Sequence, residues 1–451
     1  MNTPICDYIK KYNEENATRL HMPGHKGSSL LGLESYDITE IDGADCLYKA
    51  NGIIKESEEN ASELFDSGAT FYSCEGSSLS VRAMLYIAKA YALSKASARE
   101  PQKMYVLASR NAHTSFVSAS VLLDFEVEWL YPDNANYISG KISAEKIEKA
   151  LSCVDILPFA VYITSPDYLG NICNIKSIAD VCKRYGIPLL VDNAHGAYLK
   201  FLKKSEHPID QGATMCCDSA HKTLPVLTGG GYLHVSKDAP TFFKENARCA
   251  LSLFGSSSPS YLILASLDNA NKYINDGFSL RLADFSYVVD SLKNRLISYG
   301  YELVGDEKLK ITIKAKSYGY TGYEIYDILR SRGIVCEFCD PDFIVMMLTI
   351  ENKASDLDLI DATLKCIPQK SPILDTPPQI LPIERVISSK EAYFSPRKIV
   401  HTNETVGKIL SASVVTCPPA INIIVAGEKI TQNVVDICKY YGIDSLSVID
   451  D

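Results

Sequence analysis

CDSAHKTLPVLTGGGYLH, residues 217–234, sets Lys222 between an apolar run typical of a strand and a run of three glycines. Ser219 and His221 precede this lysine, and a small hydroxyl residue follows it. An amine condenses with an aldehyde only when its pKa is lowered, and partial burial beside polar groups lowers the pKa of a lysine. The stretch therefore indicates a Schiff-base lysine, although a solvated loop lysine is the commoner explanation for any single lysine.

Strand-like and helical segments alternate around this stretch from about residue 69 onward. Helical periodicity covers 75–96, 113–123, 143–153 and 175–186, and strand-like runs cover 103–109, 125–131, 158–166, 188–196, 214–222 and 229–236. Such alternation predicts an α/β fold with a largely parallel sheet that helices cover on both faces. Ligands of such sheets bind beyond the carboxyl ends of the strands. We therefore expect Asp192, Lys222 and Ser165 to share one rim.

Size and composition narrow the class of protein. The 451 residues exceed what one hydrophobic core serves, so we expect two domains and a terminal arm. A net charge of −10 argues against a general affinity for nucleic acid or anionic membranes. No apolar run reaches the roughly 20 residues of a membrane span, and residues 1–20 lack the apolar core of a secretory signal. We expect a cytoplasmic protein.

Fourteen cysteines are scattered through apolar segments rather than spaced as a disulfide framework. In a long chain without a secretory signal, this pattern predicts reduced, small core residues. Cys336 and Cys339 have the CxxC spacing of zinc and redox sites, but no second CxxC or histidine pair lies near them in the sequence. We therefore interpret residues 334–338 as a strand and expect no metal site.

Local patterns assign the remaining segments only in outline. Residues 19–27 (RLHMPGHKG) form an ordered arm or loop, since Pro and Gly interrupt any helix there. Residues 36–75 suggest a loop and a short helix, and 240–300 suggest helices. A second unit begins near residue 300, with strands at 308–316 and 343–350 and a helix at 323–333. After a proline-rich linker, 369–382, the chain ends in a helix near 434–443.

Three features of the expected rim have a role if the ligand is pyridoxal 5′-phosphate. Lys222 would hold the aldehyde, and Asp192 would pair with the pyridine nitrogen and keep it protonated. Gly76, Ser77 and Ser78, at the start of a long helix, would present N–H groups and hydroxyls to the phosphate. Each alone has a plain structural explanation, as a turn residue or an N-cap. The order of the features, with one strand between Asp192 and Lys222, favours the joint functional interpretation.

SAHKTL (219–224) resembles the lysine signature of the ornithine/lysine/arginine decarboxylase family, which comprises pyridoxal-phosphate enzymes of the aspartate-aminotransferase fold. The resemblance extends over nearly the whole chain, through 19–27, SRNAHTS (109–115), 164–180, DNAHGA (192–197), SSSPSYLILASLD (256–268) and CPPAINIIVAGEKIT (417–431). It implies an arm over 1–35, a large cofactor-binding domain of mostly parallel sheet over 36–295 and a smaller α+β domain over 296–451. The chain resembles short family members without an N-terminal receiver-like domain.

The resemblance also implies roles for individual residues. Lys222 would anchor the cofactor, Asp192 would pair with its ring nitrogen, His113 would stack on the ring, and His195 would lie beside the cofactor or the substrate carboxylate. From the residues alone, either histidine could equally cap a helix or sit in the core. Phosphate contacts would come from Gly76, Ser77, Ser78, Ser219 and His221. Ser165 is a further candidate cofactor contact because of its place at the expected rim. Family members have their active site at a dimer interface. The resemblance therefore implies a homodimer in which Ser256, Ser257 and Ser258 reach the phosphate held by the partner subunit.

Several positions depart from the family pattern. They are Asn193 in place of an acidic residue, Arg82, Gly229, Gly230, Cys417, Ala420 and Ala426. The cofactor residues match while these pocket-side residues differ, which leaves the substrate open.

The resemblance implies decarboxylation of arginine, lysine or ornithine to the corresponding amine. Glu404 and Asp45 are weak candidates for the acidic residues that would bind the distal cation of such a substrate. Another pyridoxal-phosphate reaction, as in an aminotransferase or lyase, and a catalytically weak paralogue that pairs with an active relative both remain alternatives.

Overall fold

A computed structural model describes residues 1–95, 104–132, 137–415 and 420–450, so Cys417 lies outside the described residues. The chain divides into two compact units. The first comprises 1–104, 155–162 and 175–281, and the second comprises 105–154, 163–174 and 282–451. The boundaries expected at residues 35 and 295 stay predictions.

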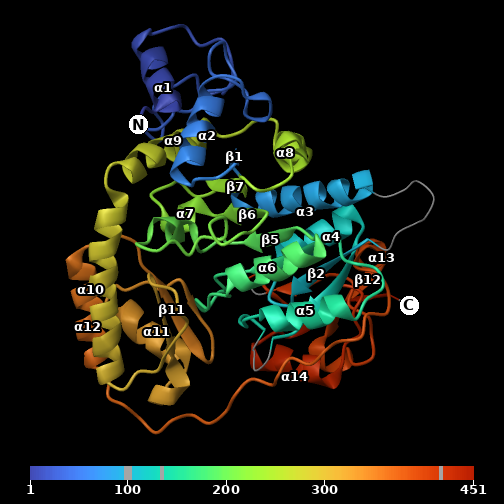
Figure 1. The fold of residues 1–451 in the computed structure, drawn as a ribbon. Coiled ribbons are helices and arrows are strands. Elements are labelled where there is room, and N and C mark those ends of the chain that lie inside the picture. The colour runs from blue at the N-terminus through green and yellow to red at the C-terminus, as the bar shows by residue number, and fades with distance from the viewer. Residues whose placement is uncertain (96–103, 133–136, 416–419, 451) are drawn as a thin grey trace. The chain divides into compact units, whose positions relative to one another are not determined.

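Seven strands form the main sheet in the order β1–β7–β6–β5–β4–β2–β3 (Figure 1). They are β1 (Ala69–Ser73), β2 (Tyr105–Ser109), β3 (Glu126–Leu130), β4 (Ala160–Thr164), β5 (Leu189–Asp192), β6 (Met215–Asp218) and β7 (Gly231–Val235). β5 pairs with β6 and β2 with β3 in parallel, whereas β7 is antiparallel to both of its neighbours. β5 and β6 are buried along their whole length, as strands covered on both faces are. The α/β fold with a mostly parallel sheet is therefore confirmed.

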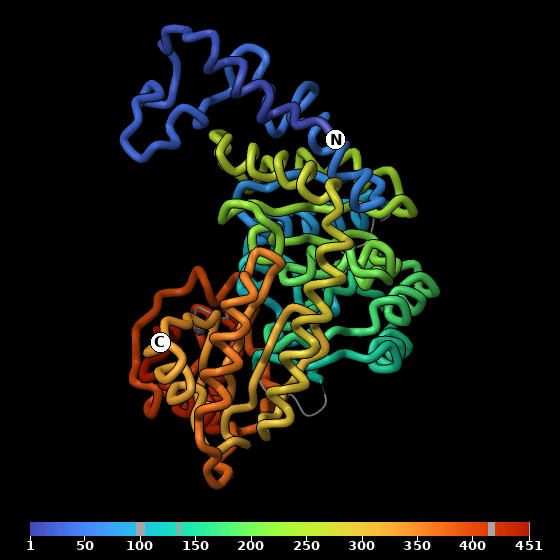
Figure 2. The backbone as a smooth tube through the Cα atoms, turned by 90° about the vertical axis from the view of Figure 1, so that its left-hand side faces the viewer, coloured from blue at the N-terminus to red at the C-terminus, as the bar shows by residue number. Residues whose placement is uncertain are grey.

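The helices of the first unit pack on its strands. The helix α3 (Gly76–Lys95) lies against β5, β6 and β7 and packs on α8 (Thr241–Phe254). Next to β1, the carboxylate of Asp268 in α9 (Tyr261–Asn275) accepts the N–H groups of Ile5 and Cys6, at the start of α1 (Pro4–Glu14), and the hydroxyl of Ser57 in α2 (Ile53–Leu64). The remaining elements of this unit are η1 (Leu47–Lys49), α6 (Ile175–Tyr185), η2 (Ala197–Phe201) and α7 (Ala220–Thr223). Figure 2 shows the blue segment after α1 as a set of loops, in agreement with the arm expected around 19–27.

The second unit contains a four-stranded sheet in the order β10–β11–β9–β8. Its strands are β8 (Leu303–Val304), β9 (Lys310–Lys314), β10 (Phe338–Cys339) and β11 (Phe343–Met347). Its helices and turns include α4 (Thr114–Leu123), α5 (Ala144–Ser152), η3 (Ala315–Tyr318), α11 (Gly322–Ser331) and α12 (Ala354–Lys365). The long helix α10 (Phe278–Ser298) precedes this sheet in the chain.

A buried ion pair links the C-terminal part of the second unit to the residue after β2. It contains α13 (Ser389–Phe394), β12 (Arg397–His401), η4 (Thr402–Glu404), β13 (Val414–Val415), β14 (Asn422–Ile424), α14 (Gln432–Tyr440) and β15 (Ser445–Ile449), which pairs with β12. Arg110, just after β2, lies 3.1 Å from the carboxylate of Glu428 and also donates to the carbonyls of Asn422 and Ile423. The C-terminal segment is thereby fixed to the loop that carries His113.

Several sequence-based assignments need correction, among them the end of the chain, where the strand β15 follows the helix expected near 434–443. The strand expected over 214–222 ends at Asp218, and Ser219 begins a turn in which its carbonyl accepts the Lys222 N–H at 3.0 Å, so Lys222 lies in α7. The strand expected over 334–338 is reduced to β10, which retains Phe338 and adds Cys339. β1, within the segment read as loop and short helix, was missed. Within the described ranges, no helix is both long and apolar enough to cross a membrane.

Asp340, between β10 and β11, predicts a pH-dependent stability. Its Oδ1 accepts the N–H groups of Asp342 and Phe343 at 2.8 and 2.6 Å, while its Oδ2 is buried without a hydrogen-bond partner. Burial raises the pKa of this carboxyl to about 7. The folded state therefore binds a proton that the unfolded chain releases near its ordinary pKa, and the stability from this proton is lost as the pH rises through about 7.

We expect Asp340→Asn to remove this dependence, because the amide keeps the Oδ1 acceptor and carries no charge. Between about pH 5 and about pH 8, the free energy of unfolding of the parent should fall by on the order of 2 kcal/mol more than that of the variant. Chemical denaturation at both pH values measures the difference, with Asp358→Asn on the exposed face of α12 as the control. Parallel pH curves for parent and Asp340→Asn would contradict the assignment.

Candidate active site

Lys222 lies in the short helix α7, which follows the carboxyl end of β6. Its side chain is half-buried, and its Nζ lies 3.0 Å from Nε2 of His195. His195 is itself buried and comes from the loop after β5. An amine and an imidazole at this distance can exchange a proton, which is the property that general acid–base chemistry needs.

Asp192 ends β5 and is 2% exposed. Its Oδ2 accepts the hydroxyl of Tyr162 at 2.9 Å, and its Oδ1 accepts the Ala194 N–H at 3.2 Å and the Cys217 thiol at 3.6 Å. Burial, reinforced by the Asp192 charge, raises the pKa of both Tyr162 and Cys217 well above their ordinary values. Both therefore stay neutral donors, and the carboxylate that they orient suits a cationic N–H group.

The start of α3 lies against the Lys222 turn. The Ser219 hydroxyl donates to Oγ of Ser77 at 2.9 Å, so the turn and the helix meet through side chains. Gly76 begins α3 with φ +64°, a conformation that favours glycine, and its N–H donates to the Gly229 carbonyl at 2.7 Å. The Gly76 N–H is thus already used, whereas the first turn of a helix leaves its other N–H groups for an anion. Ser77 and Ser78, both half-buried, belong to that turn.

His221 has a defined tautomer. Its Nδ1 lies 2.9 Å from the Gly230 carbonyl, which can only accept, so Nδ1 carries the proton. Burial lowers the pKa of this imidazole, partly offset by that hydrogen bond. A neutral His221 therefore offers a lone pair at Nε2 and would need a second proton to donate to a phosphate.

The glycine run after Lys222 is required by close packing. A Cβ on Gly231 would lie 2.8 Å from the Asp218 carbonyl and 3.0 Å from the Gly76 carbonyl carbon. Gly229 has φ +98°, and a Cβ there would lie 2.9 Å from the Cys74 carbonyl. The glycines at these positions therefore let the Lys222 turn approach the start of α3.

The serine loop between α8 and α9 is exposed. The Ser256 N–H donates to the Glu75 carboxylate at 2.8 Å, immediately before α3. Ser257 and Ser258 are exposed in the same loop. The first unit thus brings the serine loop, the start of α3 and the Lys222 turn close together along one chain.

Two of the expected residues belong to the second unit. His113 caps α4 by accepting the Ser115 N–H at 3.1 Å, and its backbone bridges to Ile421. Ser165 directly follows β4, is buried, and accepts the Cys173 N–H at 3.0 Å. Their roles at the cofactor stay predictions.

The two weak candidates for a distal cation differ in their surroundings. Burial alone would raise the pKa of Asp45, but hydrogen bonds from backbone N–H groups outweigh burial and lower this pKa. Those donors include the Gly52 and Ile54 N–H groups at the start of α2, so the carboxylate serves as a cap. Glu404 lies exposed in η4.

Sequence reasoning missed the groups that surround the Asp192 carboxylate. Tyr162 is fully buried in β4, and a buried tyrosine hydroxyl needs a partner, which was the available signal. Cys217 lies opposite Asp192 in the β5–β6 register, which no local pattern gives.

Comparison with known proteins relates this chain to a family of decarboxylases. A sequence model described as "Orn/Lys/Arg decarboxylase, major domain" matches residues 3–296. YaaO of Bacillus subtilis is 29% identical, over 96% of this chain and 92% of its own. An arginine decarboxylase of Halalkalibacterium halodurans is 28% identical, over 96% and 91%. The constitutive lysine decarboxylase of Escherichia coli is similar in fold, with a TM-score of 0.77 and 17% identity over 100% of this chain and 82% of that one.

Gly196 supports the loop that carries His195, and its replacement should disturb that loop. A Cβ on Gly196 would lie 2.0 Å from Oδ1 of Asn193 and 2.8 Å from Cδ1 of Leu199, both buried. We expect Gly196→Ala to destabilise the protein by roughly 1–3 kcal/mol, as overpacking does. Thermal unfolding measures the loss. Gly24→Ala is the control, since nothing lies within 4 Å of a Cβ there, and equal melting temperatures for the two variants would contradict the prediction.

Proposed function

This chain belongs to the Orn/Lys/Arg decarboxylase family, and we propose that it removes the α-carboxylate of a basic amino acid, with Lys222 as the anchor of its cofactor. Enzymes of this family are pyridoxal 5′-phosphate-dependent decarboxylases, and so is this one. The observation that carries the proposal is the position of Lys222, 3.0 Å from His195 in a turn that the Ser219–Ser77 contact joins to the start of α3.

The residues around Lys222 fit the cofactor in their chemistry. Lys222 would hold the aldehyde carbon, the buried Asp192 carboxylate would accept the ring N–H, and the first turn of α3 with Ser77, Ser78 and Ser219 would hold the phosphate. When bound, pyridoxal phosphate accepts the electron pair released as the bond to the carboxylate breaks.

The chain's own side chains would orient groups and move protons. Asp192 would keep the ring nitrogen protonated, since Tyr162 and Cys217 hold its two oxygens in place as neutral donors. His195 would hold or deliver a proton at Nζ of Lys222 when the substrate amine replaces the lysine. His113 and Ser165, in the second unit, stay proposed ring and cofactor contacts.

Among basic amino acids, arginine is the first substrate to test. Its support is the likeness, along nearly the whole chain, to a relative named arginine decarboxylase. Lysine and ornithine come next, because the family description includes them.

We further propose a homodimer in the cytoplasm. The N-terminal segment carries large apolar side chains that are mostly exposed in the single chain, namely Leu20, Leu30 and Leu31. An exposed apolar group of this kind suits a protein interface. The exposed Ser257 and Ser258 would then be available to the partner's phosphate.

Release of carbon dioxide tests the reaction. We expect the purified enzyme with pyridoxal phosphate to release carbon dioxide from arginine, lysine or ornithine without any keto acid, and to give the matching amine. Mass spectrometry of the amine identifies the substrate. Conversion of the cofactor to its amine form with a keto acid partner and no carbon dioxide would establish an aminotransferase instead. Cofactor binding without turnover on any of the twenty amino acids would favour the weak paralogue.

Lys222 should carry the cofactor covalently. Borohydride reduction of the loaded enzyme makes the attachment permanent, and peptide mass spectrometry should then place it on the peptide that contains Lys222. Lys222→Ala should abolish both the attachment and the turnover, because no amine remains at that position. Lys203→Ala, an exposed lysine of the same unit, is the matched control and should behave as the parent does. Attachment at another lysine in the parent would overturn the assignment.

A further inference from the structure

A second buried polar cluster lies on the back of the strands that carry the candidate site. Side chains alternate between the two faces of a strand. Asp192 and Cys217, which are paired in register, therefore face one side, and Asn193, Cys216 and Asp218 face the other. The back face thus has its own carboxylate, directly behind the site.

The carboxylate of Asp218 is fully buried and accepts three hydrogen bonds. Its Oδ1 accepts the Asn193 side-chain amide at 2.7 Å, and its Oδ2 accepts Nε2 of His207 at 3.0 Å and Nε2 of His234 at 3.2 Å. Burial alone would raise the pKa of Asp218, but the two imidazoles outweigh it and hold the pKa below its usual range. Asp218 is therefore a stable anion at the centre of the cluster.

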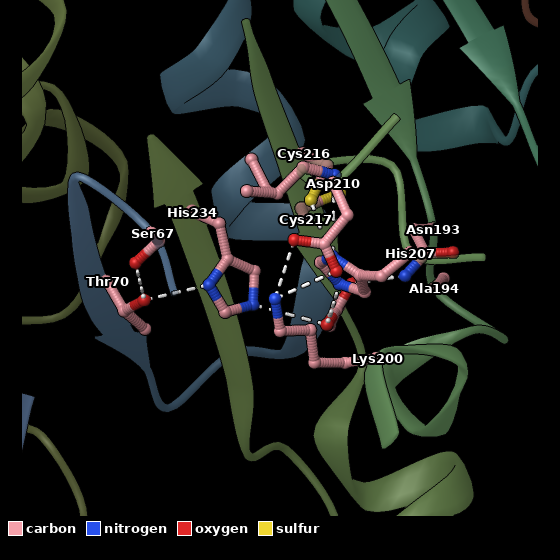
Figure 3. A network of polar contacts seen from close by, with 12 residues as sticks. Ser67, Thr70, Asn193, Ala194, Lys200, His207, Asp210, Cys216, Cys217 and His234 are labelled. Atoms are coloured by element: carbon pink, nitrogen blue, oxygen red, sulfur yellow. Dashed lines mark hydrogen bonds and ion pairs between the residues drawn. The ribbon is translucent and has the colours of Figure 1, made fainter. Parts of the chain in front are cut away.

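Each of the two imidazoles makes a second hydrogen bond through its Nδ1, which fixes the orientation of the ring. Nδ1 of His207 accepts the Ile209 N–H at 3.4 Å, which leaves the ring proton on Nε2, directed at Asp218. Nδ1 of His234 bonds to the Thr70 hydroxyl at 2.8 Å, and Thr70 bonds to Ser67. Figure 3 shows Thr70 and Ser67 on the side of His234 away from His207.

This proton pattern argues against a metal ion. Within the described ranges, His207, Cys216 and Asp218 form one group whose donor atoms could surround a cation. A metal would need the lone pair of His207 Nε2, so the ring proton would have to move to Nδ1. That proton would then point at the Ile209 N–H, which now donates to Nδ1. Burial also raises the pKa of the Cys216 thiol well above its ordinary value, which disfavours the thiolate that binds metals.

We infer that Asp218 is a positioning residue for the candidate site, an inference that rests on the proposed function. Asn193 directly follows Asp192, and its N–H donates to the Cys217 carbonyl at 3.0 Å while its side chain is held by Asp218. Asp218 in turn directly precedes the turn of Ser219 to Lys222. One carboxylate thereby joins the ends of β5 and β6 and keeps Asp192 and Lys222 at a fixed separation.

Replacing Asp218 in two ways separates position from stability. In Asp218→Asn, the introduced amide oxygen can accept both imidazole N–H groups, and its NH₂ can donate to Asn193 once that amide turns round, which its unpartnered buried Oδ1 permits. We expect its pyridoxal-phosphate dissociation constant to stay within about 3-fold of the parent value. Asp218→Ala leaves the Asn193 amide unpaired, and its dissociation constant and kcat should worsen by on the order of 10-fold or more.

The exchange of the two partners gives a stricter test. Asn193→Asp places two carboxylates against each other and should weaken cofactor binding by about 10-fold, whereas adding Asp218→Asn restores an amide–carboxylate pair and should recover most of it. Thr70→Val is the matched control, because it breaks the cluster on the far side of His234 and should lower the melting temperature with an unchanged dissociation constant.

The outcomes distinguish this inference from the proposed function. Failure of the exchange to recover binding, or losses that merely follow the melting temperature in every variant including Thr70→Val, would overturn the positioning role. About one zinc ion per purified chain by elemental analysis would overturn the proton assignment. Rebinding of pyridoxal phosphate to the full-length chain, after its cofactor has been removed, reports position even when no substrate is turned over. An inactive parent with normal cofactor affinity would therefore remove the proposed reaction and leave the positioning test intact.

Discussion

The parallel pairing of β5 with β6 is the constraint on which the candidate site depends. Both strands end at the same rim, and the Asn193 N–H to Cys217 carbonyl bond of 3.0 Å is the last backbone link before they separate. Asp192 directly precedes that hydrogen bond in β5, and Lys222 lies in the short helix α7 that follows the end of β6. The separation of a ring-nitrogen partner and an anchoring amine is therefore set by backbone register, which changes less readily than a side-chain rotamer.

The antiparallel strand β7 adds a second constraint at the same rim. Because β7 returns beside β6, its glycine-rich start must pass between the Asp218 carbonyl and the first residue of α3. Any side chain on Gly231 would push these apart. The tight passage brings the N-terminus of α3, with its anion-binding N–H groups, to the Lys222 turn. The residues between Lys222 and β7 thus serve the site through their lack of side chains.

Local patterns predicted most of the large sheet but neither its β1 edge nor its buried polar groups. The helix start at Gly76 agrees with the structure, whereas the strand expected over 188–196 ends at Asp192. β1 was missed because five residues containing Thr70 and Ser73 gain their identity as a strand from pairing with β7, far along the chain. The strand predicted over 214–222 is too long, because no residue pattern in the sequence distinguishes the Lys222 turn from a continuing strand. His207 and His234 reach one carboxylate only through the β6–β7 register and a loop, so neither could be assigned from sequence.

The carboxylates on the two faces of the β5–β6 pair have different hydrogen-bond partners, and electrostatics gives a reason for the difference. Asp192 and Asp218 end adjacent strands, so two anions there without hydrogen-bond partners would repel each other. On the back face, two imidazole N–H groups and an amide stabilise the Asp218 charge and complete its hydrogen bonding. On the front face, Tyr162 and Cys217 orient Asp192 but supply no positive charge. Among the described contacts of its carboxylate, Asp192 therefore has no cationic partner and stays available to a cationic ligand, while Asp218 already has its partners. Asn193 fits this division, because an acid at that position would place an additional anion beside Asp218 and next to Asp192 in the chain.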